Sequence, residues 1–417
     1  MNNRLLPKLK RLGNIYHDWG GFTSTIFSYA HASHDIGAGL LVALLPFISV
    51  DLGLSYLQAG FLISAYALTA GFSQIIGGWL ADRVSRPMVI AIGLAVTGLA
   101  TFAIGLSSAF YPMLAILVIM GLFAGAYHPS AAVLISDHFE KTVMGKAISV
   151  HLVGGSIGNT IGPILGGLIA NAMGWRFAYI FLSIPTLLAV PVSLTKFRKL
   201  EQASLSKLKA NIPTASSNTI EETPKRLNLL QGLRPVADII ILVTLIQLVV
   251  GSANSFFPLY LVDKYNIAPV YAAMLVGVIR GAGIAGSLLG GWLSDRWGRI
   301  NSIALALFMI GPSLFLCTIL PNNIVLIVSF AIFGLLIQMR QSTVQPYLLE
   351  RTPRYLRATI FGIYVGIGME GRSLLQPVIG YIIDTYGIID VFQVLAFITV
   401  ALSLAALLII KRPKLFR

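Results

Sequence analysis

Ionisable side chains inside long apolar runs are the residues of this sequence that could do chemistry. The first run carries His31, His34 and Asp35, and one helical turn places His31 and Asp35 on the same face. A carboxyl group removed from water favours its neutral form, so Asp35 is the leading candidate to bind and release a proton. Glu370, in a later run, is the second candidate. Metal ligation by the histidines is an alternative, but no second carboxylate clusters with them, and we expect no metal and no cofactor.

Arginines and further histidines complete the polar groups at membrane depth. A guanidinium group binds a carboxylate, phosphonate or phosphate through two parallel hydrogen bonds, so a surplus of arginine over carboxyl groups predicts an anionic ligand. Two plainer interpretations stay open. Arg280 and Glu370 could serve only to neutralise each other, and His151, near the end of its run, could serve in packing. The predicted ligand-binding residues are His34, His128, Arg280, Arg340 and Arg372.

Apolar runs must position these side chains. A membrane-spanning helix needs about 20 predominantly apolar residues. The chain is 56% hydrophobic and 11% charged, whereas a soluble domain carries roughly 25% charged residues. We therefore expect an all-α polytopic membrane protein embedded in the lipid bilayer. The twelve predicted spans are 22–49, 56–81, 87–107, 110–136, 144–171, 175–195, 236–261, 269–293, 300–319, 323–348, 357–382 and 388–410.

Basic residues lie in the short connections between these runs. The formal net charge is +14, but a nucleic-acid-binding protein would gather this charge on one face or tail, so we expect no nucleic-acid partner. Only Arg176 and Lys264 fall in the connections of the opposite side. The positive-inside rule then predicts a cell (inner) membrane protein with both termini cytoplasmic. The first run, beginning near Phe22, is too long for a signal-peptide core, and we expect it to be retained as a helix.

One ten-residue stretch occurs twice. Residues 77–86 read GGWLADRVSR and residues 290–299 read GGWLSDRWGR, with Asp295 lying 213 residues after Asp82. The chain therefore consists of two related halves. We expect a first bundle over 1–195, a second over 236–417, and between them a cytoplasmic linker over 196–235. The linker is too polar to fold alone, so it should be flexible or peripherally helical.

The spacing Gly-x-x-x-Asp-Arg-x-Gly-Arg resembles the loop between helices 2 and 3, and again 8 and 9, of the major facilitator superfamily of secondary transporters. The second copy fits the pattern, whereas the first has Ser85 for Gly and then Pro87, which should weaken its turn. The resemblance implies twelve helices in two pseudo-symmetric six-helix bundles. A glycine leaves a helix face bare, so a neighbour can approach closely at Gly78 and Gly291. The predicted gating residues are Gly78, Asp82, Arg83, Arg86, Gly291, Asp295, Arg296 and Arg299.

Glycines four residues apart mark the fifth run. From Gly154 onward they should line one helix face and permit close, sliding contact with a partner helix, while Pro163 adds a bend. The pattern Gly-x-x-x-Gly-Pro-x-x-Gly-Gly resembles that of proton-coupled exporters in the superfamily, and generic helix packing is the alternative. The residues of this antiporter pattern are Gly158, Gly162, Pro163, Gly166 and Gly167.

The fourth run lacks the arginine that drug exporters of this superfamily often carry, since that position is Leu117. It instead contains the pair His128-Pro129. Together with the pair His34-Asp35 and the glycines of the fifth run, this pair resembles the fosmidomycin-resistance branch of exporters.

These resemblances imply a secondary active transporter that works by alternating access, and neither an enzyme nor a cofactor-dependent protein. The expected function is proton-coupled export, by antiport, of a small organic compound that is anionic or amphiphilic. The expected partners are this small-molecule substrate, protons and lipid, with the chain a monomer. One alternative is a uniporter or proton symporter that imports an organic anion. The other is a non-transporting membrane receptor, against which the duplicated loops argue. The sequence has no Gly-x-x-x-x-Gly-Lys-Ser/Thr loop, so ATP is not the expected energy source.

Overall fold

The computed structural model describes residues 16–81, 83–210, 229–321, 324–353, 356, 360, 363–364 and 371–410. Within these residues, eleven helices are long and apolar enough to cross a membrane. In chain order the elements are α2 (Gly21–Leu52), α3 (Tyr56–Ala81), α4 (Arg86–Gly105), α5 (Phe110–Ala124), α6 (Tyr127–His138), α7 (Lys141–Met173), α8 (Trp175–Val192), η1 (Ser193–Phe197), α9 (Arg198–Ala210), α10 (Leu229–Leu233), α11 (Ala237–Tyr265), α12 (Pro269–Trp297), α13 (Arg299–Ile319), α14 (Ile324–Arg351), η4 (Gly371–Leu375), α16 (Gln376–Tyr386) and α17 (Ile388–Ile410).

Eleven of the predicted spans therefore match helices, with ends that differ by a few residues. Of the remaining span, 357–382, the described residues are 360, 363–364 and 371–382, of which the last stretch forms η4 and the start of α16. The chain divides into two compact units. The first contains Met1–Leu41 and Thr69–Ala215, and the second contains Val42–Leu68 and Ser216–Arg417. This division falls inside the predicted linker but also assigns the outer parts of α2 and α3 to the second unit, and the predicted bundle boundaries stay a prediction.

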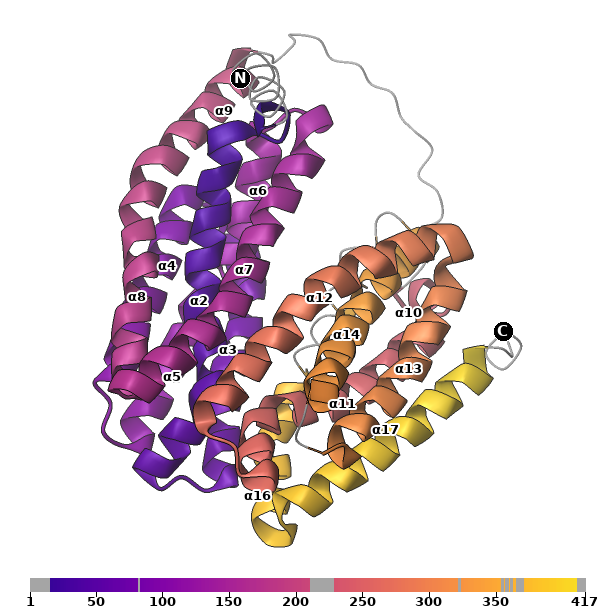
Figure 1. Cartoon of the computed structure of the whole chain (residues 1–417). Coiled ribbons are helices and arrows are strands. Elements are labelled where there is room, and N and C mark those ends of the chain that lie inside the picture. Colours follow the sequence, from indigo (N-terminus) through magenta and orange to yellow (C-terminus); the bar gives the residue numbers. More distant parts are fainter. Residues whose placement is uncertain are drawn as a thin grey trace, which may run out of the picture. The chain divides into compact units, whose positions relative to one another are not determined.

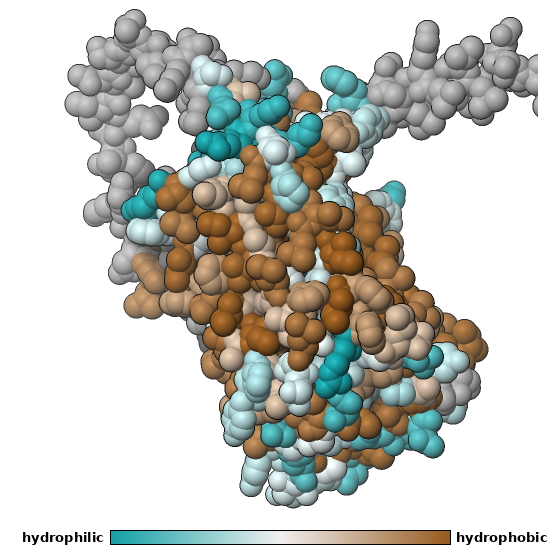
Figure 2. Space-filling model, turned by 90° about the vertical axis from the view of Figure 1, so that its left-hand side faces the viewer, coloured by the Kyte–Doolittle hydropathy of each residue, from teal (hydrophilic) through white to brown (hydrophobic). Residues whose placement is uncertain are grey.

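The predicted linker begins as a helix. Helix α8 continues through η1, a single π-helical segment, into α9 without a break (Figure 1). Helix α9 is charged and polar. The sixth spanning helix therefore extends beyond its apolar run. On the face shown in Figure 2, hydrophobic side chains cover the middle and hydrophilic ones gather toward the ends. This distribution is typical of a protein that spans a lipid bilayer.

The fourth predicted span is interrupted. Helix α5 ends at Ala124, α6 begins at Tyr127, and Pro129 follows in the first turn of α6. Proline has no backbone N–H, and the last carbonyls of a helix have no partner within that helix. The His-Pro pair thus lies just after a break between two helices within this membrane span.

The two copies of the repeated loop reach their next helix by different backbone paths. Gly298, before α13, has φ +88°, a region that L side chains rarely adopt. Ser85, at the matching position before α4, has φ −58° and ψ 118°. Its hydroxyl donates a hydrogen bond to the carboxylate of Glu201 in α9 (2.7 Å), and the backbone N–H of Arg86 donates to the other carboxylate oxygen (2.9 Å). The departure from glycine is therefore compensated by α9.

Small residues bring the start of α3 against α16 within the second unit. A Cβ added to Gly60 would overlap the backbone carbonyl of Gln376, and one added to Gly380 would overlap that of Tyr56. The hydroxyl of Ser64, one turn after Gly60, donates a hydrogen bond to the η4 backbone. The two helices thus touch along more than two turns with almost no side chain between them.

Acidic residues fix the end of this contact. The Asp384 carboxylate, in the last turn of α16, accepts hydrogen bonds from the backbone N–H groups of Tyr56 (2.9 Å) and Leu57 (2.8 Å). These are the first residues of α3, whose N–H groups have no partner within the helix. The Tyr56 hydroxyl donates to Asp263 of α11.

Candidate functional site

The first polar cluster lies in the first unit and is centred on α2. Oδ1 of the Asp35 carboxylate accepts a hydrogen bond from Nδ1 of His34 (2.8 Å). The other oxygen, Oδ2, lies 3.3 Å from Nε2 of His31. All three residues are buried, with exposed fractions of 7% or less. His31 and Asp35 therefore lie on the same helix face, as predicted, and are in contact.

Helix α7 supplies the third partner of Asp35. The side-chain amide of Asn159 donates a hydrogen bond to Oδ2 of Asp35 (2.6 Å). One turn earlier, a Cβ added to Gly155 would lie 2.5 Å from His31 Nε2 and 2.9 Å from Asp35 Oδ2. Gly155 therefore makes the space in which the histidine and the carboxylate meet.

His151 of α7 closes the cluster on the other side. Its backbone carbonyl accepts a hydrogen bond from His31 Nδ1 (2.9 Å), and its ring stacks on the His31 ring with centroids 4.2 Å apart. Its own Nδ1 donates to the Phe27 carbonyl (3.1 Å). The packing role considered for His151 agrees with these contacts.

The interruption between α5 and α6 serves the same cluster. Nε2 of His34 donates to the carbonyl of Ala124 (3.1 Å), the last residue of α5. The His34 ring stacks on Tyr127 with centroids 4.8 Å apart, and the partly exposed His128 lies against His31 and His34 at 5.2 and 5.0 Å. The His-Pro motif thus supplies both an acceptor and a neighbouring imidazole.

Three predicted residues of the first half, Asp35, His34 and His128, are therefore brought together. Gly155 and Asn159 also belong to the cluster but were not among the predicted site residues. Asn159 lies inside the antiporter pattern and Gly155 follows Gly154, so their neighbours in sequence were the available signal.

This cluster contains three side chains that could together bind a metal ion. Atoms of His31, Asp35 and His128 lie within 4.8 Å of one another. Both Asp35 oxygens are, however, already engaged by side-chain donors, which is the arrangement of a hydrogen-bonded ion pair. The expectation that the chain holds no metal stays a prediction.

A second polar cluster lies in the second unit. Arg340 of α14 is 2% exposed, and its Nη2 donates to the side-chain oxygen of Gln247 in α11 (2.6 Å). Its Nη1 is buried and has no hydrogen-bond partner among the described residues. Arg372 of η4 lies over Gly251, where an added Cβ would be 3.2 Å from Arg372 Nη1 and 3.3 Å from the Gln247 amide nitrogen.

Two of the three predicted arginines thus converge on one glutamine. Arg280, the third, is exposed on α12. Glu370 lies outside the described residues, and so does its suggested pairing with Arg280. An unpaired buried guanidinium nitrogen is costly in free energy, so this cluster has the chemistry of an anion-binding site.

The two clusters occupy equivalent positions in the two halves. Aligning the halves through Asp82 and Asp295 matches three polar residues of one cluster to three of the other, whereas His31 and Asp35 align with Thr244 and Leu248. The matched pairs are His34 and Gln247, Tyr127 and Arg340, and Asn159 and Arg372. The same three helix positions therefore carry imidazole, phenol and amide in the first half and amide and guanidinium in the second.

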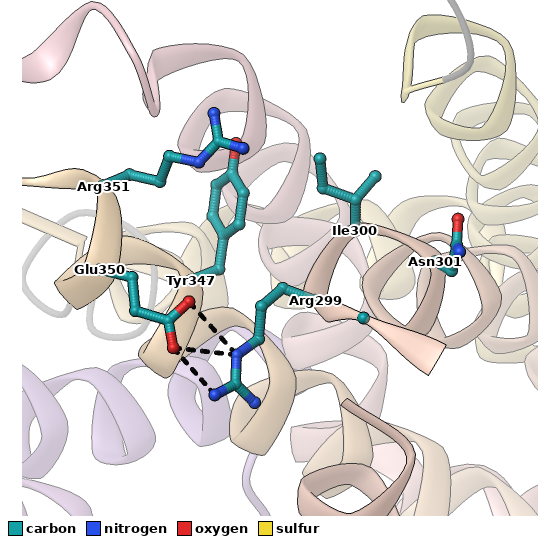
Figure 3. Close-up of a pocket in the computed structure, with 7 residues that line it drawn as sticks. Arg299, Ile300, Asn301, Tyr347, Glu350 and Arg351 are labelled. Carbon is teal, nitrogen blue, oxygen red and sulfur yellow. Dashed lines mark hydrogen bonds and ion pairs between the residues drawn. The ribbon is translucent and has the colours of Figure 1, made fainter. Parts of the chain in front are cut away.

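The repeated loops also match in their ion pairs. Arg86 donates to Asp137 (2.5 Å), and the equivalent Arg299 donates to Glu350 (2.8 Å). Figure 3 shows the latter pair, in which Nε and Nη2 of the guanidinium face the carboxylate beside Tyr347 and Arg351. Arg299 also donates to Asp295 (2.6 Å), whereas Asp82 lies outside the described residues.

The remaining loop arginines bind to their own helices. Arg83 lies over the Trp79 ring at 4.2 Å, and the equivalent Arg296 lies over Trp292 at 5.3 Å. Each arginine thus packs on the tryptophan four residues earlier, Arg296 within α12 and Arg83 just beyond the end of α3. A gating role for both stays a prediction.

The glycine of close approach is one residue earlier than expected. A Cβ added to Gly77 would overlap Ala126, and one added to Gly290 would overlap the backbone of Met339. At Gly291, by contrast, an added Cβ would meet nothing within 4 Å, so the contact predicted there is wrong. The repeat begins with two glycines, and only the helix rotation decides which faces the neighbour. Gly78 belongs to α3, and its surroundings are not among those described.

The antiporter pattern lies in α7 and packs on α2. Added Cβ atoms at Gly154, Gly158 and Gly162 would overlap or crowd the α2 carbonyls of Ser28, Ala32 and Ile36 in turn. Helix α7 continues through Pro163 to include Gly166 and Gly167. The backbones of α2 and α7 therefore meet along the same stretch that holds His31 and Asp35.

Comparison with known proteins places this architecture. A model of the Major Facilitator Superfamily matches residues 27–375. The chain belongs to the Major Facilitator Superfamily. It is therefore a membrane transporter of a small-molecule substrate and not an enzyme, with twelve helices in two six-helix bundles.

Relatives within the superfamily are distant but cover most of the chain. The cis,cis-muconate transport protein of Acinetobacter baylyi is 25% identical over 344 residues, which are 80% of this chain and 81% of that protein. The fosmidomycin resistance protein of Escherichia coli is 22% identical over 373 residues, 89% of this chain and 88% of that protein. A crystal structure of a peptide transporter of the POT family has a TM-score of 0.76 at 14% identity and covers 94% of each chain, which shows the shared fold.

Proposed function

We propose that this transporter is a proton-coupled antiporter that exports a small organic anion by alternating access. The observation that carries the proposal is Arg340, whose buried Nη1 has no hydrogen-bond partner among the described residues. Its Nη2 donates to Gln247, and Gln247 and Arg372 both lie against Gly251. An anion would supply the missing acceptor and offset two positive charges. The exposed Arg280 is proposed as a further contact for the substrate.

Proton coupling is proposed for the first cluster. It combines a buried carboxylate with histidines, the side chains that exchange protons near neutral pH. Asp35 and Glu370 are the proposed coupling carboxylates, with His34 and His128 beside Asp35. We assign the protein to the inner membrane with both termini cytoplasmic, because most basic residues lie in the connections of one side. We also propose that it acts as a monomer.

Export is supported by the glycine contacts of α7 with α2, which follow the pattern of the exporters that the sequence resembles. Two relatives bear the names of anions, since muconate and fosmidomycin are both negatively charged at neutral pH. Import of an organic anion by symport uses the same two clusters and is the second candidate.

Transport by the purified protein in proteoliposomes distinguishes the two. With substrate inside and acid outside, an antiporter accelerates substrate efflux, because entering protons exchange for the anion. A symporter slows this efflux and instead accumulates external substrate. A response to ATP, or none to the proton gradient, would refute proton coupling.

Substrate charge is tested by binding of matched anionic, neutral and cationic compounds. Arg340→Gln removes a charge-assisted hydrogen bond of ~1.5–3 kcal/mol. The affinity for the anionic compound should therefore fall by about 10- to 100-fold, while the affinity for the neutral compound stays the same. Arg351→Gln, an exposed arginine later in the same helix, is the matched control. If cations bind best and Arg340→Gln binds anions normally, the anion proposal is wrong.

A further inference from the structure

Each of the two histidines beside Asp35 faces two oxygen acceptors, whereas a neutral imidazole can donate only one hydrogen bond. A neutral imidazole has one N–H and one lone pair. His31 faces the His151 carbonyl with Nδ1 (2.9 Å) and the Asp35 carboxylate with Nε2 (3.3 Å). Either neutral tautomer leaves a lone pair opposite an oxygen. Only the doubly protonated ring satisfies both contacts.

His34 has the same property on its own side. Its Nδ1 faces Asp35 Oδ1 (2.8 Å), and its Nε2 faces the Ala124 carbonyl (3.1 Å). These two acceptors hold His34 as the permanent partner of Asp35, buried at 1% exposure and stacked on Tyr127. One imidazolium and one carboxylate make a neutral pair.

The Asp35 carboxylate, for its part, is surrounded by donors. Its Oδ1 receives His34, and its Oδ2 receives the Asn159 amide at 2.6 Å in addition to His31. Hydrogen bonds that donate to a carboxylate favour its ionised form. A proton placed on either oxygen would compete with one of these donors.

His31 differs from His34 in ways that suit exchange. Its contact with Asp35 is the longest in the cluster, and its exposed fraction is 6%, against 1% for His34. The titratable groups that face it are Asp35 and His34 on α2, Tyr127 and His128 on α6, and His151 on α7, whose Nδ1 already donates to the backbone.

We propose that the coupling proton is carried by His31, while Asp35 remains ionised throughout the cycle in its pair with His34. This inference rests on the proposed proton coupling and changes its carrier. Uptake of one proton by His31 changes the cluster from neutral to a net charge of +1. Release returns it to neutral and leaves an unshared lone pair against one acceptor.

The position of that lost hydrogen bond links protonation to helix contact. Asp35 is on the same helix as His31, so their distance is fixed by α2. The other acceptor, the His151 carbonyl, is on α7. Deprotonation therefore weakens the contact of α2 with α7, at the level where Gly154 and Gly158 bring the two backbones together.

Spectroscopy of the purified full chain tests this carrier without depending on transport. The chain has six histidines, so a spectrum of protein with 15N-labelled histidine is sparse enough to assign with His31→Gln. We expect both His31 nitrogens to be protonated at acid pH and one at alkaline pH. The infrared difference between these states should show no carboxylic acid band that Asp35→Asn removes. Such a band, or a His31 ring that does not titrate, would overturn the proposal.

Proton release on substrate binding provides the functional counterpart. His31→Gln should bind substrate but release no proton, whereas His17→Gln, an exposed histidine outside the cluster, should release as the wild type does. If wild-type transport ignores the proton gradient, the proposed function fails. If transport follows the gradient and the Asp35 band appears, only the assignment to His31 fails.

Discussion

At the scale of single residues, Gly155 controls the space of the first cluster. A methyl group there would lie 2.5 Å from the His31 ring, and neither the ring nor Asp35 can retreat without losing a hydrogen bond. Gly155→Ala should therefore uncouple transport from the proton gradient by at least about tenfold, a change of about 1.4 kcal/mol in coupling free energy. Gradient-driven transport relative to substrate exchange measures this ratio.

Gly145→Ala is the matched control for this substitution. Gly145 is in the same helix, and an added Cβ would meet nothing within 4 Å. Helix propensity gains equally from both changes, so their difference isolates the contact with His31. Equal coupling ratios in the two variants would show that the space at Gly155 is unimportant.

Some of this cluster could be predicted from sequence and some could not. The cost of charge in an apolar run identified Asp35, His34 and His128, and helical spacing related His31 to Asp35. Spacing within one helix does not determine which helix lies opposite. Asn159 and Gly155 became visible only when α7 was placed against α2. The same ignorance of rotation explains why Gly291 was expected to make the contact that Gly290 makes.

At the scale of elements, the contact of α3 with α16 depends on one carboxylate. Asp384 accepts hydrogen bonds from two backbone N–H groups at the start of α3. Its negative charge is also stabilised there by the positive end of the helix dipole. Asp384→Asn removes the charge and one acceptor, at a cost of about 1 kcal/mol. The N–H groups of α3 near Tyr56 should then exchange about fivefold faster.

Hydrogen exchange followed by mass spectrometry of peptides from the start of α3 measures this effect. Asp390→Asn, an exposed carboxylate in the first turn of α17, is the control. Unchanged exchange in Asp384→Asn would show that the glycine contacts at Gly60 and Gly380 hold α3 without the carboxylate.

The helices themselves were predictable because each apolar run is long enough to span the membrane as a helix. Their interruptions were not, since 110–136 reads as one apolar run although the structure divides it into α5 and α6. Pro129 marked the place but not the consequence. What the break provides, a backbone carbonyl for His34, depends on the position of α2, a contact about ninety residues distant in sequence.

At the scale of the whole molecule, the repeated loops predict a symmetric gate. Asp295 is bound by Arg299, and Asp82 is its counterpart in the first half. Asp82→Asn and Asp295→Asn should each favour the inward-open state. Asp295 is largely exposed, so its pair is worth at most about 1 kcal/mol and the population should change by no more than about fivefold.

Distances between spin labels across the face that carries the repeated loops report this population. Glu140→Gln, which removes an exposed carboxylate without a side-chain capping bond, controls for charge alone. Identical distance distributions in the wild type and both aspartate variants would remove these residues from the gate.

The equivalence of the two polar clusters has a consequence for ancestry. If the halves descend from one duplicated gene, a single ancestral niche diverged into an acid-base site and a guanidinium site by substitutions at three matched positions. Relatives can then be classified by these positions together with position 35, where this chain has an aspartate. Histidine beside an acid in the first half with arginine in the second should mark carriers that exchange protons for anions. Arginine in both niches should instead mark carriers that exchange one anion for another.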